Sequence, residues 1–556
     1  MDIQRGTTIP SDLNPSGYTN INEVFEHTCK KYAQKPAFTS FGKTLSYQEL
    51  KQYADAFAVY LQKETDLQPG DRIAIQLPNL IQYPVVLFGA IKAGLVIVNT
   101  NPLYTPREME HQFNDSGAKA LVIFKNMASN AEKILHNTQI KHVFVTQIGD
   151  LHGFFKRCLL NSVVKYVKKA EPPFNIPNAL ELRDVLSRYV GQHPTPVEVK
   201  TADIAVLQYT GGTTGLSKGA VLSHGNLVSN MVQGHHLINQ APAGWADTAI
   251  APLPLYHIYA FTLSLIIMDC GGHSVLIANP RDLDGFIKEM KKWKTSAFMG
   301  LNTLFIGLCN KPEFKDVDFS QFKITISGGC ALTLKAAEMW KSITGSQIME
   351  GYGLTETSPA VSINSPRDIR LGTIGQPLKH TEVIIVNPDG EHLPDGEIGE
   401  LCVKGPQVMV GYWQRERETE ASFTDDGYFM TGDIAVRDSE GFLRIVDRAK
   451  DMILVSGFNV YPNEIEDVFS LHPDILECAA VSMPDEHSGE SVRLFAVAKD
   501  PEIKPSVKEL KEWSKDQLTR YKIPKDIVYV SELPKTNVGK VLRRQLKEQF
   551  KSDQAA

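Results

Sequence analysis

Cysteine pairs and zinc-binding patterns are missing from this sequence of 556 residues. Its seven cysteines are an odd number, and none lies in the CxxC or Cys/His spacing that holds zinc. Disulfides persist mainly in oxidising compartments, so this pattern favours a reduced, cytoplasmic protein. The first residues, MDIQRGTTIPSDL, also lack the apolar segment of a secretory signal peptide.

Long apolar runs and an excess of positive charge are missing as well. The longest apolar stretches, residues 84–98 and 258–268, are shorter than the roughly 18 to 20 residues that span a bilayer. The net charge of −6 argues against general binding to nucleic acid. We therefore expect no transmembrane helix and no nucleic-acid partner.

The length predicts more than one domain, because a single core stops growing at about 250 to 300 residues. Short Val/Ile-rich runs alternate with amphipathic stretches over residues 71–147 and 201–351, which is typical of parallel sheets covered by helices. Residues 380–446 contain PDG turns between strands and favour antiparallel pairing. After the charged segment DRAKD, about a hundred residues have their own strands and helices.

We therefore predict an α/β protein in three parts. Residues 1–447 form a large N-terminal domain of stacked α/β sheets, which ends in a small β subdomain over about 375–447. Residues 448–451 form a hinge, and residues 452–556 form a small mobile α+β domain. A turn inside one domain explains the charged segment equally well at this point.

A loop rich in glycine and hydroxyl side chains, YTGGTTGLSKG, occupies residues 209–219. Such a loop suits phosphate oxygens, because glycines let the backbone approach closely and hydroxyls and N–H groups donate hydrogen bonds. The residues involved are Thr210, Gly211, Gly212, Thr213, Thr214, Gly215, Ser217 and Lys218. The loop departs from the Walker A pattern because Gly219 follows Lys218 where a metal-binding hydroxyl is needed. A metal ion must then be held elsewhere, unless the loop is only a flexible turn.

Other segments offer the remaining parts of a nucleotide site. In EGYGLTETS, Tyr352 can stack on a base, Thr355 can donate a hydrogen bond and Glu356 can hold Mg²⁺. In TGD, Asp433 can accept hydrogen bonds from ribose, and PKTNVGK places Lys540 in a loop ahead of a helix. Each of these residues could separately be a turn residue, a helix cap or a solvated charge.

Taken together, the motifs resemble the adenylate-forming superfamily of acyl-CoA synthetases, luciferases and peptide-synthetase adenylation domains. The resemblance runs from about Asn22 to Lys547 and rests on YTGGTTGLSKGAVLSH, PLYHIYAF, ISGG, EGYGLTE, TGDIAV, VDRAKDMILVSGFNVYP and PKTNVGK, in that order. Stretches such as GELCVKGPQVMVGYWQR are similar to bacterial long-chain fatty acid CoA ligases in particular. The resemblance implies two steps: a fatty acid and ATP give acyl-AMP and pyrophosphate, and coenzyme A then displaces AMP.

The resemblance also implies roles for single residues. The loop from Thr210 to Lys218 would hold the β- and γ-phosphates, and Glu356 with Thr213 would hold Mg²⁺. Lys540 would contact the attacking carboxylate and the α-phosphate. The nucleoside would be bound by Gly329, Cys330, Ala331, Tyr352, Gly353 and Thr355 around adenine, and by Asp433 and Arg448 at the ribose.

Three further positions follow from the same resemblance. His257 would lie beside the acyl carboxylate, although a core histidine is the alternative. Lys450 would be the point about which the small domain rotates, and Gly457 would leave room for the pantetheine arm of coenzyme A. Cys330 and Ala331 depart from the Met and Pro of many relatives, which puts the pocket shape in doubt but not the chemistry.

Residues 151–174 combine apolar side chains with the positive charges of Lys156, Arg157, Lys165, Lys168 and Lys169. This pattern is typical of a helix on an anionic membrane surface, and equally of a surface helix packed on its own domain. The leading hypothesis is thus a cytoplasmic long-chain fatty acid CoA ligase, peripheral on the inner face of a membrane through residues 151–170. A ligase for medium-chain or aryl acids, an acyl-AMP ligase serving a carrier protein, a non-catalytic acyl-nucleotide binder and a homodimer are left open.

Overall fold

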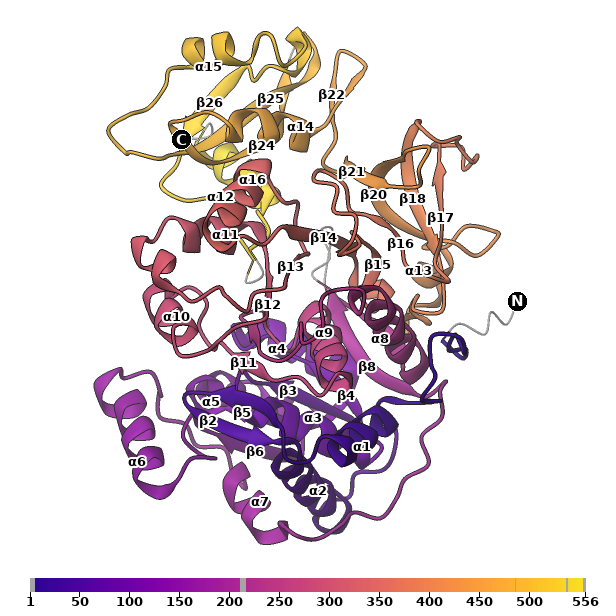
Figure 1. The fold of residues 1–556 in the computed structure, drawn as a ribbon, viewed down its shortest axis with the longest axis vertical. Helices are drawn as coiled ribbons and strands as arrows, with labels where there is room; N and C mark the ends of the chain where they lie inside the picture. The colour runs from indigo at the N-terminus through magenta and orange to yellow at the C-terminus, as the bar shows by residue number, and fades with distance from the viewer. Residues whose placement is uncertain (1–5, 211–216, 486, 537–538, 554–556) are drawn as a thin grey trace.

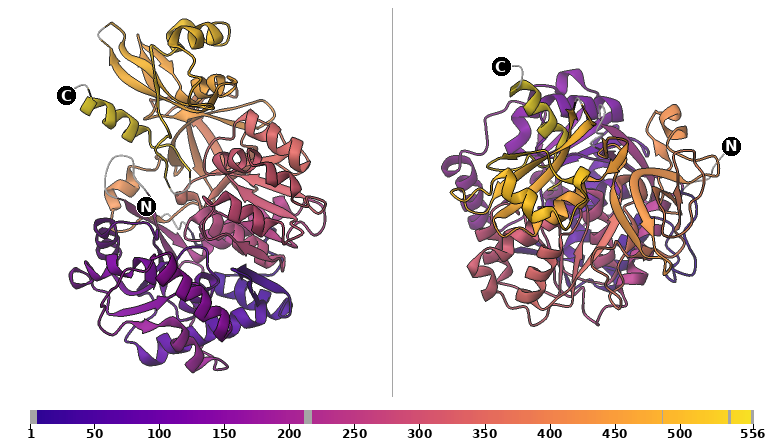
Figure 2. Two further views of the ribbon diagram at one scale, coloured as in Figure 1. Left: turned by 90° about the vertical axis from the view of Figure 1, so that its left-hand side faces the viewer. Right: turned by 90° about the horizontal axis from the view of Figure 1, so that it is seen from above.

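The computed structural model describes residues 6–210, 217–485, 487–536 and 539–553. A smaller C-terminal part caps one end of an elongated molecule, and helices α2, α6 and α7 lie at the opposite end (Figures 1 and 2). The fold is mixed α/β with a large N-terminal and a small C-terminal part, as predicted.

One mainly parallel sheet contains the strands predicted between residues 71 and 147. Its order is β19-β9-β8-β4-β3-β5-β6-β7. The strands are β3 (Arg72–Gln76), β4 (Val96–Asn99), β5 (Ala118–Phe124), β6 (His142–Thr146), β7 (Leu180–Glu181), β8 (Ile204–Thr210), β9 (Lys218–Ser223) and β19 (Gly411–Tyr412). The helices between them are α3 (Gln82–Lys92), α4 (Pro106–Ser116), α5 (Lys125–Glu132), α6 (Phe154–Ser162), the π-helix η2 (Val163–Val167) and α7 (Leu182–Tyr189).

The second large sheet has the order β16-β15-β14-β13-β12-β10-β11-β1-β2. Its strands are β1 (Pro36–Ser40), β2 (Lys43–Ser46), β10 (Ala249–Ala251), β11 (Ser274–Leu276), β12 (Ala297–Gly300), β13 (Ile324–Ser327), β14 (Ile348–Gly353), β15 (Ala360–Ile363) and β16 (Gln376–Pro377). Its helices are α1 (Ile21–Lys31), α2 (Tyr47–Glu64), α8 (His224–Ile238), α9 (Ile258–Asp269), α10 (Leu283–Met290), α11 (Asn302–Cys309) and α12 (Leu334–Thr344).

Helices α8 and α9 pack against each other and share one continuous core with both large sheets. Ser223 caps α8: its hydroxyl oxygen accepts a hydrogen bond from the N–H of Asn226, and the N–H of Ser223 donates one to Oδ1 of Asn226. Most of α8 is buried, so its polar residues meet protein partners rather than water. The two helices thereby form a fixed wall beside the strand ends of the second sheet.

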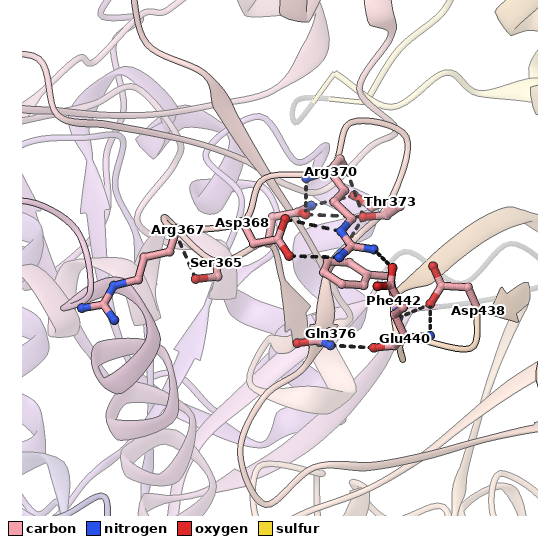
Figure 3. A network of polar contacts seen from close by, with 11 residues as sticks. Ser365, Arg367, Asp368, Arg370, Thr373, Gln376, Asp438, Glu440 and Phe442 are labelled. Atoms are coloured by element: carbon pink, nitrogen blue, oxygen red, sulfur yellow. Dashed lines mark hydrogen bonds and ion pairs between the residues drawn. The ribbon is translucent and has the colours of Figure 1, made fainter.

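The segment expected to be antiparallel is an antiparallel sheet with the order β17-β18-β20-β21. Its elements are β17 (Glu382–Val386), β18 (Ile398–Lys404), α13 (Glu416–Glu420), β20 (Phe429–Arg437) and β21 (Leu443–Arg448). Arg370 fastens it to the loop after β15: the guanidinium pairs with Asp368 and Glu440 and lies 3.8 Å from the centre of the Phe442 ring (Figure 3).

The C-terminal part has its own sheet and its own buried clusters, which begin at Ile453, whereas the main core ends at Leu443. Its elements are β22 (Ile453–Val455), β23 (Phe458–Val460), α14 (Pro462–Ser470), β24 (Ile475–Asp485), β25 (Gly489–Ala498), α15 (Val507–Ser514), β26 (Asp526–Tyr529) and α16 (Arg543–Asp553). The strands and helices expected after the charged segment are therefore present. Within the described ranges, no helix is long and apolar enough to cross a membrane.

Candidate active site

A cavity with about 730 Å³ of empty space lies where α8 and α9 meet the ends of β13 and β14. Its wall is mostly α8, α9 and two glycine-containing loops, and one residue of the C-terminal part, Lys540, also lines it. The lining residues that the sequence predicted for the site are His257, Gly329, Tyr352, Gly353, Thr355 and Lys540. The structure therefore brings together six residues that are spread over nearly 300 positions of the chain.

A chain of three polar side chains borders the cavity on the side of the β subdomain. The hydroxyl of Tyr352 donates a hydrogen bond to Oδ2 of Asp433 at 2.5 Å, and Oδ1 of Asp433 pairs with Nε of Arg448 at 3.2 Å. Asp433 and Arg448 are register partners on β20 and β21, so the sheet itself sets their distance. Asp433 is buried and can accept hydrogen bonds from a polyol while Arg448 balances its charge.

Glu356 lies in the 3₁₀ turn Thr355–Thr357 that follows β14. Its Oε1 accepts a hydrogen bond from the hydroxyl of Tyr412 at 2.9 Å, and burial raises the pKa of its carboxyl group. The ring of Tyr412 also lies under Lys218, whose ammonium is 5.3 Å from the ring centre and pairs with Glu418 at 2.8 Å. Tyr412 thus connects the end of the phosphate loop to the predicted metal ligand.

His257 and Lys540 line the cavity together. His257 begins α9 and caps it, because Nδ1 accepts a hydrogen bond from the N–H of Tyr259 at 3.4 Å. Burial, helped by the charge of Lys540, lowers the pKa of His257 to about 4, so its imidazole is neutral at pH 7. Burial lowers the pKa of Lys540 too, with Arg448 contributing. The alternative of an enclosed core histidine does not fit a side chain that lines a cavity.

Most of the predicted phosphate loop, Gly211, Gly212, Thr213, Thr214 and Gly215, lies outside the described residues. Its two ends, Thr210 and Lys218, are register partners on the antiparallel strands β8 and β9. A third side chain approaches the loop, because Nε2 of His111 is 3.0 Å from the carbonyl oxygen of Ser217. The pairing of β8 and β9 fixes where the loop leaves and re-enters the fold.

Gly329 has a left-handed backbone, with φ +84°, at the turn after β13. Cys330 and Ala331 follow it on the way to α12, outside the lining of the cavity. Leu332, next in the chain, donates its N–H to buried Glu350 at 2.9 Å. This bond holds the loop that carries Gly329 against β14.

The two positions predicted to serve domain motion are both exposed. Lys450 lies in the turn between β21 and β22, where the chain leaves the β subdomain. Gly457 forms the β22–β23 turn with φ +83°, and among the described residues, its chain neighbours aside, no atom lies within 4 Å of the position where its Cβ would be. Gly457 does not line the cavity that Lys540 enters.

Arg543 is a polar centre of the C-terminal part that the sequence did not single out. Its Nη2 donates to Glu466 at 2.8 Å and to Asn463 at 2.9 Å, and Nη1 lies 3.5 Å from Asp451. Asn463 in turn donates its N–H to Asp447 at 2.8 Å. The segment GKVLRR, in which Arg543 lies three residues after Lys540, carries no sequence signal of these distant partners. Tyr412, which lies in the quoted stretch GPQVMVGYWQR, was also missed because its partner Glu356 is 56 positions away.

Comparison with known proteins agrees with this arrangement. Residues 25–413 match the family model of AMP-binding enzymes, and residues 464–540 match the model of the AMP-binding enzyme C-terminal domain. The chain belongs to the AMP-binding enzyme family. The resemblance inferred from the motifs is therefore confirmed.

Relatives of this family member match nearly its whole length. It is 47% identical to a long-chain-fatty-acid–CoA ligase of Salmonella typhimurium over 97% of this chain and 96% of the relative, and 33% identical to that of Bacillus subtilis over the same shares. Among solved structures, ATP-bound MatB from Rhodopseudomonas palustris is 29% identical, with a TM-score of 0.82 over 96% of this chain and 99% of that one. The anthranilate CoA ligase AuaEII, at 23% identity and a TM-score of 0.86 over 97% and 98%, shares the fold.

Proposed function

We propose that the protein is an AMP-forming ligase that joins a long-chain fatty acid to coenzyme A through an acyl-AMP intermediate. The observation that carries this proposal is the cavity in which Lys540 of the C-terminal part meets His257 and the Tyr352–Asp433–Arg448 chain of the N-terminal part. Its named relatives at 47% identity support the substrate class. Medium-chain or aryl acids are the alternative substrates.

In the first step the fatty acid carboxylate attacks the α-phosphate of ATP. Such a reaction needs alignment and charge neutralisation more than a covalent enzyme group. The ribose hydroxyls bind Asp433 and Arg448, the adenine lies against Tyr352 and Gly329, and the phosphates follow the strand ends toward Thr210 and Lys218. Lys540 then places its ammonium between carboxylate and α-phosphate, and His257 remains neutral beside the carboxylate.

Glu356 with Tyr412 fits a Mg²⁺ site that the nucleotide completes. Mg²⁺ is usually held by one or two carboxylates, substrate phosphates and water rather than by a protein cage. Glu356 offers one such carboxylate, and the described residues contain no cluster of three or more acidic, His or Cys side chains for a metal. When bound, Mg²⁺ would neutralise phosphate charge, and Glu356 with Thr213 would hold it.

In the second step the thiol of coenzyme A displaces AMP, which requires another arrangement of the two parts. Lys540 occupies the cavity while Gly457 is exposed, which supports the arrangement for acyl-AMP formation. We propose residues 448–451 as the hinge, residues 1–447 and 452–556 as the domains, and Lys450 as the pivot. Rotation would withdraw Lys540 and bring the β22–β23 turn to the cavity, where Gly457 leaves room for the pantetheine arm.

The part of the cavity between α8 and α9 suits the acyl chain. It is lined there by Gly234, Thr262, Leu263 and Ile266, and these residues lead away from His257 along both helices. Gly234 lets α8 pack closely on α9 at this point, because a Cβ there would lie 2.7 Å from Cδ1 of Ile266. An apolar channel of this kind selects aliphatic chains over short polar acids.

The test is AMP release measured with hexadecanoate, octanoate and coumarate, each with and without coenzyme A. We expect the fastest release with hexadecanoate and a requirement for coenzyme A. Fastest release with coumarate would replace the substrate class, and turnover independent of coenzyme A would favour a carrier-protein ligase. Absence of pyrophosphate exchange with every acid would favour a non-catalytic binder.

We also propose that α6 and η2 contact an anionic membrane surface. Their large apolar side chains are unusually exposed, up to 87% at Phe155 and 74% at Val167. Lys156, Lys165, Lys168 and Lys169 are exposed around them. Charge with apolar anchors is the combination that binds a lipid surface from water.

Vesicles of anionic and zwitterionic phospholipid test this contact by co-sedimentation. We expect binding to anionic vesicles that weakens with salt and is lost in Lys165→Glu/Lys168→Glu/Lys169→Glu. A matched control is Lys288→Glu/Lys291→Glu/Lys292→Glu, which changes the same number of charges around α10. Equal binding of both triple variants would reject the contact.

A further inference from the structure

Three side chains at the ends of α8 and α9 form a nucleophile, base and carboxylate arrangement outside the nucleotide site. Nδ1 of His235 lies 2.6 Å from Oδ2 of Asp269, and Nε2 of His235 lies 3.5 Å from Sγ of Cys270. Asp269 also accepts a hydrogen bond from the hydroxyl of Tyr18 at 2.9 Å. His235 is therefore held between a carboxylate and a thiol, which is the geometry that activates cysteine nucleophiles.

Two basic side chains and one carboxylate surround Cys270. The hydrogen bond to Asp269, and then that to Cys270, raise the pKa of His235 to about 10, so an imidazolium faces the sulfur at neutral pH. Lys31 of α1 adds a second positive charge. Tyr32 is the main cause of a raised pKa of Lys31, and Asp269 and Cys270 contribute to it. Two cations and one carboxylate therefore leave one net positive charge beside the sulfur.

Cys270 differs from the other six cysteines in its exposure and in the partner of its sulfur. All seven cysteines are among the described residues. Cys29, Cys309 and Cys402 are buried, and burial raises the pKa of each thiol. Cys158 is exposed on α6 and has no ion pair or hydrogen bond to its sulfur within the described ranges. Cys270 alone combines partial exposure with an imidazole in contact with the sulfur, again within those ranges.

We propose that Cys270 is a modification site that undergoes thiol–disulfide exchange with low-molecular-weight disulfides. The Cys270 thiolate attacks one sulfur of the disulfide R–S–S–R, a Cys270–S–S–R bond forms, and the old S–S bond breaks to release R–S⁻. Cys270 is oxidised and the departing thiol is reduced, so no further oxidant is needed. His235 stabilises the attacking thiolate, and Asp269 with Tyr18 orients His235.

The site lies directly behind the acyl end of the cavity. His235 follows Gly234 in α8, and the N–H of Cys270 donates to the carbonyl oxygen of Ile266 at 3.2 Å. Gly234 and Ile266 both line the cavity, and a Cβ on Gly234 would lie 2.7 Å from Cδ1 of Ile266. A group attached to Cys270 would therefore move the helix ends that close the channel. This consequence rests on the proposed function, whereas the reactivity of Cys270 does not.

Oxidised glutathione is the probe for the reaction, with the full-length protein and peptide mass spectrometry as readout. We expect Cys270 to form the mixed disulfide about tenfold faster than Cys158, although Cys158 is more exposed. His235→Gln should slow Cys270 by about tenfold and leave Cys158 unchanged. The matched control is His236→Gln, because His236 is the exposed neighbour on the same helix.

Thermal melting shows whether the His235 variant is folded, and Lys31→Gln, a surface change, provides a second test if it is not. Labelling of Cys270 no faster than that of Cys158 would overturn the proposal, as would an unchanged rate in a folded His235→Gln or in Lys31→Gln.

A second measurement concerns the channel and separates the two proposals. The mixed disulfide should lower ligase activity with hexadecanoate at least about fivefold more than with octanoate, because only the longer chain reaches the helix ends. Cys270→Ser should abolish this difference. Equal activity of labelled and unlabelled enzyme with both acids would remove the link to the channel. Absence of ligase activity with any acid, together with fast labelling, would reject the proposed function and leave the reactive thiol in place.

Discussion

Tyr412 joins two charged residues of the site that lie far apart in the chain. Its hydroxyl donates to Glu356, and its ring supports Lys218. The hydrogen bond opposes the effect of burial on the pKa of Glu356, so it helps to keep the carboxyl group ionised. A residue outside the lining of the cavity can in this way control the ionisation of the predicted metal ligand.

Tyr412→Phe should weaken Mg²⁺ binding by about tenfold. Burial raises the pKa of Glu356, and Mg²⁺ needs the ionised form, so the Mg²⁺ requirement of pyrophosphate exchange should rise as pH falls. Loss of the Tyr412 hydroxyl raises this pKa further. The increase in the Mg²⁺ requirement should then begin at a higher pH. Mg²⁺ titrations at several pH values measure the shift. Tyr428→Phe, which removes a hydroxyl bonded to Glu382 in the same subdomain, is the control, and an identical profile in both variants would contradict the role.

Lys540→Ala should reduce acyl-AMP formation by about a hundredfold or more, because one positive charge aimed at the reacting groups is lost. Thioester formation from preformed acyl-AMP should be largely spared, since Lys540 acts before that step. Pyrophosphate exchange and single-turnover thioester formation measure the two steps separately. Lys547→Ala, on α16 nearby, should leave both intact, and equal loss of both steps in Lys540→Ala would refute the assignment.

At the scale of elements, the turn between β22 and β23 and the loop that carries Lys540 both belong to the C-terminal part, where an isolated bridge between Lys535 and Val541 closes the loop. Lys540 on the loop lies in the cavity, and Gly457 in the turn is exposed. In the proposed rotation the two would exchange places without unfolding either part, because both are carried by a part with its own core. The order of the two reactions then follows from which element faces the cavity.

Gly457→Leu should slow thioester formation at least about tenfold and spare acyl-AMP formation, because a side chain would fill the path of the pantetheine arm. Leucine is also strained at φ +83°, so the control must share that strain. Gly390→Leu does so: it has φ +82°, no atom within 4 Å of its Cβ position, and lies in the β17–β18 hairpin. A loss of the thioester step equal to that in Gly390→Leu would show that strain alone is responsible.

The elements were largely predictable from the sequence, whereas their polar contacts were not. The strands of residues 71–147 are short apolar runs that parallel sheets bury on both faces, and their pattern is local. Helix α15 ends at Ser514, where the N–H groups of Gln517 and Leu518 both donate to the carbonyl oxygen of Ser514 and the chain turns. The contacts Tyr412–Glu356 and Arg543–Glu466 join residues 56 and 77 positions apart, and only the assembled fold brings them together.

At the scale of the whole molecule, Asp447 lies where the two parts meet. It is fully buried, and its carboxylate accepts hydrogen bonds from the N–H groups of Arg448 at 2.7 Å and Asn463 at 2.8 Å. Arg448 belongs to β21 and Asn463 to α14, so the same carboxylate holds both sides of the proposed hinge. Burial raises the pKa of Asp447 to about 6, although the charge of Arg543 opposes this effect.

The docked arrangement, in which Asp447 is buried between β21 and α14, should therefore be favoured as pH falls. A carboxyl group with pKa about 6 when docked and 3.8 when exposed binds more protons in the docked state. Its contribution to the stability of the docked arrangement is fully present below pH 3.8 and is lost as pH rises through about 6. This contribution amounts to at most about 3 kcal/mol. Hydrogen exchange of the Asn463 N–H, corrected for its intrinsic pH dependence, should show stronger protection at pH 5 than at pH 7.5. Asp447→Asn should remove this difference, because an amide does not titrate, while Asp451→Asn, an acid in the same turn, should retain it. Equal protection of the wild-type protein at both pH values would show that Asp447 does not couple protons to docking.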